Sequence, residues 1–204
     1  MVTVLWILIA YGSYLIGWQL QLQDPDPKLR EVLQDKYCKW QHGFSFVYLA
    51  VFGLWRKQPE PEVILQAFTV SALLLAACID YYVQNIPDVI YVPGYVSGVA
   101  WLILQHPPAE VISSLIIFAG LQALMFSRLY GGSDCIAYSM CALYLAGTGG
   151  ILLDYLLFML LTVGIEAVVQ IKHHNLDFRH GRLKKPVALI PYMTVSMLLW
   201  VLLT

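Results

Sequence analysis

The run Ser71-Ala72-Leu73-Leu74-Leu75-Ala76-Ala77-Cys78-Ile79-Asp80 joins a long apolar stretch directly to a carboxylate. Such a stretch predicts a helix in hydrocarbon or in a protein core. A carboxylate beside hydrocarbon costs free energy, so it usually has a partner or a function. A second aspartate, Asp134, follows the turn Gly131-Gly132-Ser133 and precedes another apolar segment. The two aspartates together indicate an acid–base pair at a membrane boundary.

The composition is typical of a membrane protein. Hydrophobic residues make up 59% of the 204 residues and charged residues only 12%, which is about half the charged share of a soluble domain. We expect a single integral-membrane domain covering 1–204, because no long polar stretch could form a separate soluble domain. The net charge of −1 argues against nucleic-acid binding, which needs a basic surface. The run 2–16 lacks a following Ala-x-Ala-like cleavage site, so it predicts a retained helix.

Apolar segments recur along the whole chain. A helix of about 17 to 22 residues can cross the hydrocarbon of a bilayer. We therefore predict an all-α, polytopic membrane protein with about eight transmembrane helices. The expected segments are 2–20, 41–56, 62–79, 89–105, 110–127, 135–147, 150–171 and 186–203.

The basic residues are distributed unevenly around these segments. With an external N-terminus, the internal loops are 21–40, 80–88, 128–134 and 172–185, and of the 12 Lys and Arg residues only Arg56 and Lys57 remain outside. Cytoplasmic loops are enriched in Lys and Arg, so this asymmetry predicts the orientation. It places Asp80 and Asp134 together at the cytoplasmic face. The internal residues are Lys28, Arg30, Lys36, Lys39, Arg128, Lys172, Arg179, Arg182, Lys184 and Lys185.

Two adjacent carboxyl groups can hydrolyse a peptide bond. The ionised one activates water, and the protonated one polarises the scissile carbonyl. Because both cannot ionise easily at close range, their pKa values separate and the pair titrates as a unit. Gly131 and Gly132 allow a substrate strand to approach closely, and Ser133 can hydrogen-bond to a carboxylate or to substrate. Asp88, which follows Ile86-Pro87, is expected to cap the next helix.

These residues resemble the motifs of one protease family. Ile79-Asp80, with Ile86-Pro87-Asp88 and Pro93, resembles the Ile-Asp…Ile/Leu-Pro-Asp…Pro signature of type IV prepilin peptidases. Gly131-Gly132-Ser133-Asp134 resembles the Gly-x-Gly-Asp motif of the same membrane aspartyl proteases. The segment from Lys185-Pro186 to Pro191 is similar to the closing proline segment of that family. With the eight-helix layout, the resemblance covers nearly the whole chain.

The resemblance implies a function and a set of site residues. Asp80 and Asp134 take the catalytic positions, and no metal or other cofactor is implied. The substrates would be prepilins and pseudopilins of type IV pilus and secretion systems, cleaved after the N-terminal leader at the cytoplasmic face of the inner (plasma) membrane. The supporting or substrate-binding residues would be Asp88, Gly131, Gly132 and Ser133.

The chain departs from the family pattern at three places. Ser133 stands where the motif has its second glycine, and Ile136 replaces the lysine found two residues after the aspartate. The cytoplasmic loop with paired Cys-x-x-Cys motifs is missing, since 21–40 contains only Cys38. The missing loop suggests a short form with peptidase activity alone, without N-methylation. The other two departures leave reduced or altered activity open.

Two other functions are compatible with the sequence. Asp154 and Glu166 lie inside the seventh apolar segment, as expected for a proton-coupled transporter or channel. The sequence has no evident inverted repeat, which argues against a transporter. A catalytically weak relative that binds leader segments, or a scaffold, would fit the Ser133 and Ile136 departures.

Two further patterns have ordinary structural interpretations. His173, His174, Asp177 and His180 have the spacing of a metal cluster, but neighbouring Lys and Arg side chains would repel a cation. We therefore predict a basic cytoplasmic loop there and no metal. Gly94 and Gly98 form a Gly-x-x-x-Gly pair, which we interpret as a close packing contact between helices.

Overall fold

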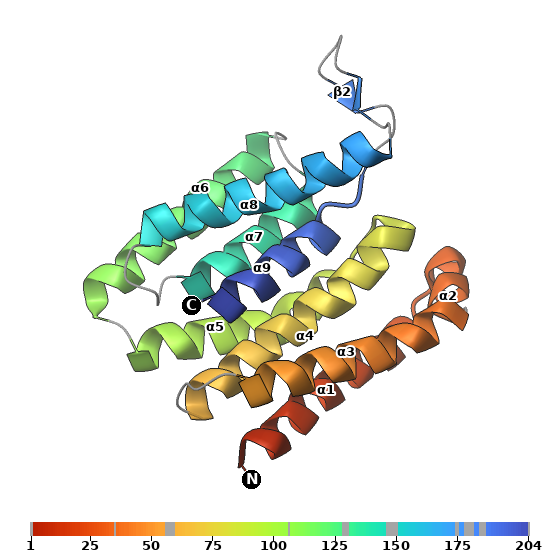
Figure 1. Cartoon of the computed structure of the whole chain (residues 1–204), viewed down its shortest axis with the longest axis horizontal. Helices are drawn as coiled ribbons and strands as arrows, with labels where there is room; N and C mark the ends of the chain where they lie inside the picture. Colours follow the sequence, from red (N-terminus) through yellow and green to blue (C-terminus); the bar gives the residue numbers. More distant parts are fainter. Residues whose placement is uncertain are drawn as a thin grey trace.

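The chain is an elongated bundle of α-helices in the computed structural model (Figure 1). The structure describes residues 2–34, 36–55, 60–105, 107–127, 131–145, 151–173, 176–177, 182–183 and 187–203. Its elements are α1 (Val2–Gln21), α2 (Pro27–Gln34), α3 (Lys36–Trp55), α4 (Glu60–Val83), the 3₁₀ helix η1 (Asp88–Tyr91), α5 (Val92–Gln105), α6 (Pro108–Ser127), α7 (Gly132–Leu145), α8 (Ile151–Lys172), β1 (Leu176–Asp177), β2 (Arg182–Leu183) and α9 (Ile190–Leu203).

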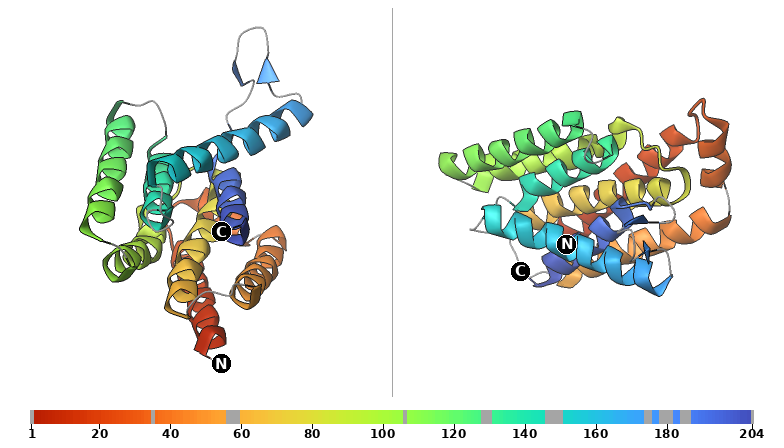
Figure 2. Two further views of the ribbon diagram at one scale, coloured as in Figure 1. Left: turned by 60° about the vertical axis from the view of Figure 1, so that its left-hand side comes forward. Right: turned by 90° about the horizontal axis from the view of Figure 1, so that it is seen from above.

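The helix α4 is the centre of the bundle. It packs against α1, α3, α5, α7 and α9, and Figure 2 shows it enclosed by helices from both halves of the chain. Most of its apolar stretch Val63–Val83 is buried within the protein. A helix that is apolar on all its faces must be surrounded by other apolar helices or by lipid. The run that ends at Asp80 therefore forms the core of the fold.

The predicted helical class is confirmed, whereas the number of membrane spans stays a prediction. Each expected segment contains a helix. Within the described ranges, three helical stretches are long and apolar enough to cross a membrane: Thr3–Gln21, Val63–Val83 and Leu153–Lys172. The shorter apolar helices are Asp88–Leu104, Pro108–Leu124 and Ile190–Leu203.

The expected loop at 21–40 is wrong, because it contains α2 and the start of α3. The reason is an amphipathic pattern in α2. Leu29 and Leu33 stand four residues apart and are both buried, while the charged side chains Lys28 and Arg30 are exposed. One helical turn separates the two leucines, so they share the face that packs on the bundle. The side chain of Cys38 lies outside the part of the chain that is described.

The Gly94 and Gly98 pair packs α5 closely against α7, as predicted. A Cβ atom on Gly98 would lie 3.0 Å from Cβ of Leu143, and one on Gly94 would collide with the Met140 side chain. Small residues at such positions allow two helix backbones to approach. This contact orients α7, whose N-terminal turn contains Asp134.

Several helix ends gather at one end of the bundle. The C-terminal ends of α4 and α8 and the N-terminal ends of α7 and α9 lie toward the end that also holds α2 (Figure 1). The strands β1 and β2 pair antiparallel, with Leu176 opposite Leu183, and project beyond this end (Figure 2). The predicted loop at 172–185 therefore includes this short hairpin.

Of the predicted histidine cluster, His174 and His180 lie outside the described residues.

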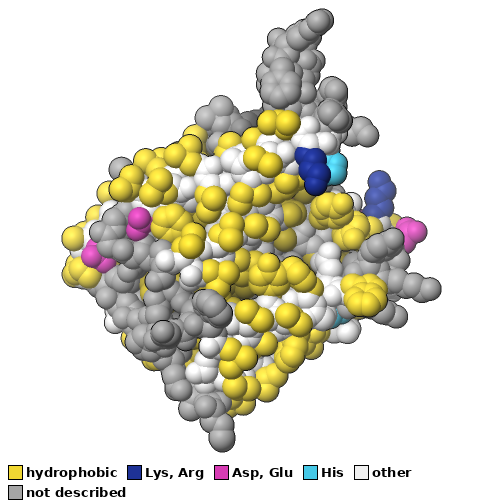
Figure 3. Space-filling model, in the orientation of Figure 1, with side chains coloured by type: hydrophobic (Ala, Val, Ile, Leu, Met, Phe, Trp, Pro, Cys, Tyr) yellow, Lys and Arg dark blue, Asp and Glu magenta, His cyan; other side chains and the backbone are white. Residues whose placement is uncertain are grey.

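The surface in the view of Figure 3 is mainly apolar between the two ends of the bundle. The Lys, Arg and His side chains visible on this face gather toward the end of α2 and the hairpin. Acidic side chains are visible at both ends. The described part of this face therefore has an apolar middle and basic groups at one end.

Candidate active site

Asp80 lies in the last turn of α4, not in the loop expected to begin there. The helix continues to Val83 and ends where Gln84 adopts a positive φ of 55°. The N–H of Gln84 donates to the carbonyl of Asp80 at 3.2 Å, which closes the helix with a left-handed residue. Non-glycine residues rarely adopt this conformation. The helix thus holds the Asp80 side chain inside the bundle, where it is only 6% exposed.

The carboxylate of Asp80 caps the N-terminus of α9. Its Oδ2 accepts a hydrogen bond from the backbone N–H of Ile190 at 3.1 Å, and the N–H of Leu189 also donates to it. The first N–H groups of a helix have no partner within the helix. Pro191 has no N–H, so it needs no acceptor in this turn. The part of the predicted closing proline segment that the structure describes therefore meets Asp80.

Asp134 lies in the first turn of α7, whereas 128–134 was expected to be a loop. The N–H of Cys135 donates to the carbonyl of Gly131 at 3.1 Å, so Gly131 begins the helix as its N-cap. The N–H of Gly131 in turn donates to the Asp134 carboxyl group. The second contact is the half of a capping box in which the N3 side chain accepts from the N-cap N–H, and it begins the helix earlier than its apolar residues indicate. A Cβ on Gly131 would lie 2.9 Å from Oδ2 of Asp134.

The two aspartates lie close enough to interact. The charge of Asp80 acts on Asp134, and both carboxyl groups act on the phenol of Tyr91. Tyr91 is completely buried, and its hydroxyl donates to the carbonyl of Ser133 at 3.4 Å. Tyr91 therefore joins η1 to the first turn of α7, within the electrostatic influence of both acidic groups. Sequence reasoning missed Tyr91, because a tyrosine in an apolar segment is common and nothing in the local sequence distinguishes this one.

A third acidic residue belongs to the same region. Glu166 of α8 acts electrostatically on Asp134 and on Tyr192 of α9. Gln170, one helical turn after Glu166, donates from Nε2 to the Tyr192 hydroxyl at 3.0 Å. Residues four apart lie on the same helix face. This face of α8 is therefore turned toward the first turn of α9, beside the two aspartates.

The surroundings of Asp134 favour its protonated form. Burial is the main cause, the charges of Asp80 and Glu166 add to it, and the Gly131 N–H opposes it; together they raise the pKa of Asp134 to about 6. Asp134 precedes the apolar part of α7 and is outside the three helices that are long and apolar enough to span a membrane. The carboxyl group is thus able to carry a proton near neutral pH.

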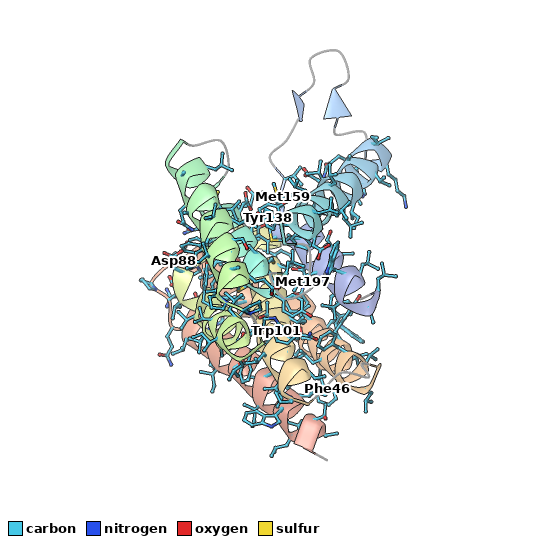
Figure 4. The ribbon with its side chains drawn as sticks, turned by 90° about the vertical axis from the view of Figure 1, so that its left-hand side faces the viewer. Phe46, Asp88, Trp101, Tyr138, Met159 and Met197 are labelled. Atoms are coloured by element: carbon cyan, nitrogen blue, oxygen red, sulfur yellow. The ribbon has the colours of Figure 1, made fainter. Side chains whose placement is uncertain are left out.

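The other predicted site residues have smaller or different roles. Asp88 is exposed at the start of η1 and lies at the edge of the bundle, away from the interior side chains of Tyr138 and Met197 (Figure 4). The N-cap of η1 is Pro87, so the prediction that Asp88 caps this helix is wrong; proline fixes the turn instead. Gly132 is exposed in the first turn of α7. The described contact of Ser133 is through its carbonyl.

An apolar groove lies beside Asp80. It has a volume of about 750 Å³ and is formed by α3, α4 and α9. Cys78 and Tyr81, which flank Asp80 in α4, contribute to its wall, as do Trp40 and Pro191. In the described ranges, no group of three or more His, Cys, Asp or Glu side chains is arranged to hold a metal ion.

No family model, no curated protein and no solved structure matches this chain. The argument for function consequently depends on the two carboxyl groups and their neighbours.

Proposed function

We propose that the chain is a membrane aspartyl endopeptidase. The observation that carries this proposal is that Asp80 of α4 acts electrostatically on Asp134 of α7, although the two helices are far apart in the sequence. Both are partly or fully enclosed by helices, where a pair of carboxyl groups shares a proton more readily than in water. The sequence motifs around the same two residues support the same chemistry.

The reaction proposed is hydrolysis of a peptide bond. The ionised carboxylate takes a proton from water while the water oxygen bonds to the carbonyl carbon. The protonated carboxyl gives its proton to the carbonyl oxygen. When the tetrahedral intermediate collapses, the carboxyl group that took the proton from water gives it to the amine nitrogen and the C–N bond breaks. The other carboxylate takes the proton of one hydroxyl group as the new C=O bond forms, so both carboxyl groups return to their starting states and the step uses no metal.

The proposed location is the inner (plasma) membrane, with about eight spans and the site at the cytoplasmic face. The described Lys28, Arg30 and Lys172 lie in α2 and in the last turn of α8, at the same end of the bundle as the carboxyl groups (Figure 1). Positive residues favour the cytoplasmic side. The apolar middle in Figure 3 is the surface that hydrocarbon would cover.

The proposed substrate is the N-terminal leader of prepilin-like or pseudopilin-like proteins. The support is the resemblance of the segments around Asp80 and Asp134 to the prepilin peptidase motifs. The bond to be cut lies just before a hydrophobic helix of the substrate. That helix must unwind locally, because a peptide bond inside a helix is not accessible to two carboxyl groups. Asp80 is nearly enclosed, so helix ends around it must also move during cleavage.

The test is cleavage of a prepilin-like substrate by the purified protein in lipid or detergent. Asp80→Asn and Asp134→Asn should each reduce the cleavage rate by about 100-fold or more, as expected for loss of a general acid or base. Asp154→Asn is the matched control, since Asp154 lies in the first turn of α8, at the other end of that helix from Glu166. Full activity in either site variant would contradict the assignment.

One observation favours a second candidate, a proton-coupled transporter or channel. Glu166 lies within a helix that is apolar enough to span a membrane, and it acts on Asp134. A row of acidic groups is what a proton path requires. A transporter would show proton flux in liposomes without proteolysis. A leader-binding scaffold would bind substrate tightly without turnover.

A further inference from the structure

Two tyrosines of η1 and α5 are hydrogen-bonded to the start of α7. The hydroxyl of Tyr91, the last residue of η1, donates to the carbonyl of Ser133 at 3.4 Å. The hydroxyl of Tyr95, in the first turn of α5, donates to the carbonyl of Ile136 at 2.9 Å. Val92 between them has helical backbone angles, φ −54° and ψ −48°, so η1 continues into α5. The two tyrosines are four residues apart and therefore share the face that is turned toward α7.

The two carbonyl groups can accept these bonds without leaving the helix. A carbonyl oxygen has two lone pairs, so one can accept the helical N–H four residues on while the other accepts a tyrosine hydroxyl. Ser139 of α7 joins the second contact, because its hydroxyl lies against the Tyr95 hydroxyl and donates to the Ile136 carbonyl at 2.8 Å. Tyr91 and Ser139 are both completely buried. Buried hydroxyl groups are costly to leave without a partner, so these contacts fix the start of α7 against α5.

The part of α7 that the tyrosines hold carries Asp134, which lies between Ser133 and Ile136 in the chain. Further along, α5 and α7 meet through apolar packing, such as Gly98 against Leu143. Apolar attraction is non-directional, whereas a hydrogen bond depends on angle as well as distance. The tyrosine bonds therefore add a restraint on the rotation of this turn that apolar packing does not supply.

We propose that Tyr91 and Tyr95 are positioning residues for Asp134. Their hydroxyl groups hold the start of α7 in one rotation about the helix axis, and this rotation sets where the Asp134 carboxyl group points. The catalytic part of this inference rests on the proposed peptidase function, in which a displacement of about 1 Å can cost about 100-fold in rate. The restraint on α7 does not depend on any reaction, so it can be measured without substrate.

Replacing tyrosine by phenylalanine is the sharpest change, because it removes the hydroxyl and keeps the buried ring. The first variant is Tyr95→Phe, and a double variant that adds Tyr91→Phe removes both bonds. Tyr11→Phe is the matched control. Tyr11 of α1 also donates to a backbone carbonyl, that of His42 in α3, at 3.2 Å. This control therefore loses the same kind of bond between two helices other than α5 and α7.

The first experiment measures the labelling of Cys135 by N-ethylmaleimide in the purified protein. Cys135 is 1% exposed in the first turn of α7, and its N–H donates to the carbonyl of Gly131 at 3.1 Å, so its thiol reacts when this turn opens. In Tyr95→Phe the labelling rate should rise roughly fivefold, the factor by which loss of one hydrogen bond favours opening. It should rise further in the double variant. Cys141, completely buried later in the same helix, is the internal reference, and Tyr11→Phe should leave both rates unchanged.

The second experiment measures kcat and KM for cleavage of a prepilin-like substrate. In Tyr95→Phe, kcat should fall about 10-fold while KM stays nearly constant, because a misplaced acid weakens an interaction made in the transition state. Tyr11→Phe should keep the wild-type kcat, although it also lacks one tyrosine bond.

Unchanged labelling of Cys135 in the double variant would overturn the inference. It would also be overturned by an equal fall of kcat in Tyr11→Phe, or by a wild-type kcat in a double variant whose Cys135 reacts faster. If Cys135 labelling responds as expected but the wild type cleaves nothing, the peptidase function alone is contradicted.

Discussion

The backbone N–H of Ile190 donates to the carboxylate of Asp80 at 3.1 Å, which joins the first residue of α9 to the last turn of α4. Thr194, one helical turn further along α9, donates to the carbonyl of Leu73 at 3.3 Å. The two contacts fix α9 along the central helix. Asp80 is therefore both a candidate catalyst and a structural cap, and its substitutions must be interpreted with both roles in mind.

Asp80→Ala and Asp80→Asn should separate these two roles. Alanine leaves two buried N–H groups of α9 without an acceptor, which should lower the free energy of unfolding by about 1–3 kcal/mol. Asparagine keeps one acceptor oxygen and should cost clearly less. Both variants should abolish cleavage. Thermal unfolding in detergent measures the loss of stability. Equal destabilisation by the two variants would contradict the capping role.

Gly131→Ala should impair the site while leaving the fold intact. The new Cβ would lie 2.9 Å from Oδ2 of Asp134, so the carboxyl group must rotate away from its capping position. We expect a loss of activity of at least about 10-fold, since small displacements of catalytic groups are costly. Gly12→Ala is the control, because a Cβ on Gly12 meets nothing within 4 Å. Equal activity of the two variants would show that the Asp134 position is not critical.

Asp134 should make stability depend on pH. Its pKa is raised from the ordinary 3.8 to about 6, so the folded protein holds this proton more tightly than the unfolded chain. The stabilising contribution is complete below about pH 4 and is lost as the pH rises through about 6. The melting temperature of the wild type minus that of Asp134→Asn should therefore be larger at about pH 4.5 than at about pH 7.5. A difference between the two proteins that does not vary with pH would contradict this linkage.

Gly98→Ala should destabilise the packing of α5 on α7. The added methyl would lie 3.0 Å from Cβ of Leu143, which is attached to the helix backbone and cannot move aside alone. Overpacking of this kind costs about 1–3 kcal/mol. Gly120→Ala in α6 is the matched control, since nothing lies within 4 Å of its new Cβ, and alanine is the better helix former by about 1 kcal/mol. Chemical denaturation should show a lower free energy of unfolding for Gly98→Ala than for the wild type, and a higher one for Gly120→Ala.

The helices were largely predictable, but their ends were not. Apolar runs and prolines are local signals, and they located all the expected segments. Asp80 and Asp134 were expected in loops and are found in helical turns, because capping contacts extend a helix beyond its apolar residues. α2 was missed because its apolar face consists only of Leu29 and Leu33, which is too short a pattern to separate from a polar loop.

The sequence predicted the acidic residues of the candidate site but not the groups that surround them. Asp80 and Asp134 were singled out by the cost of a carboxylate near hydrocarbon. Tyr91, Gln170 and the N–H of Ile190 gave no such signal, since a tyrosine, a glutamine or a backbone amide in an apolar segment is common. Their importance comes from which helix faces meet.

The sequence by itself determined that the chain is helical and apolar and that Asp80 ends one apolar segment while Asp134 precedes another, because these properties depend on neighbouring residues along the chain. Only the tertiary structure decided that Asp80 caps α9, that Tyr91 contacts the first turn of α7, and that Glu166 acts electrostatically on Asp134. These relationships depend on how each helix is rotated about its axis. That rotation is set by packing contacts across the bundle, such as Gly98 against Leu143.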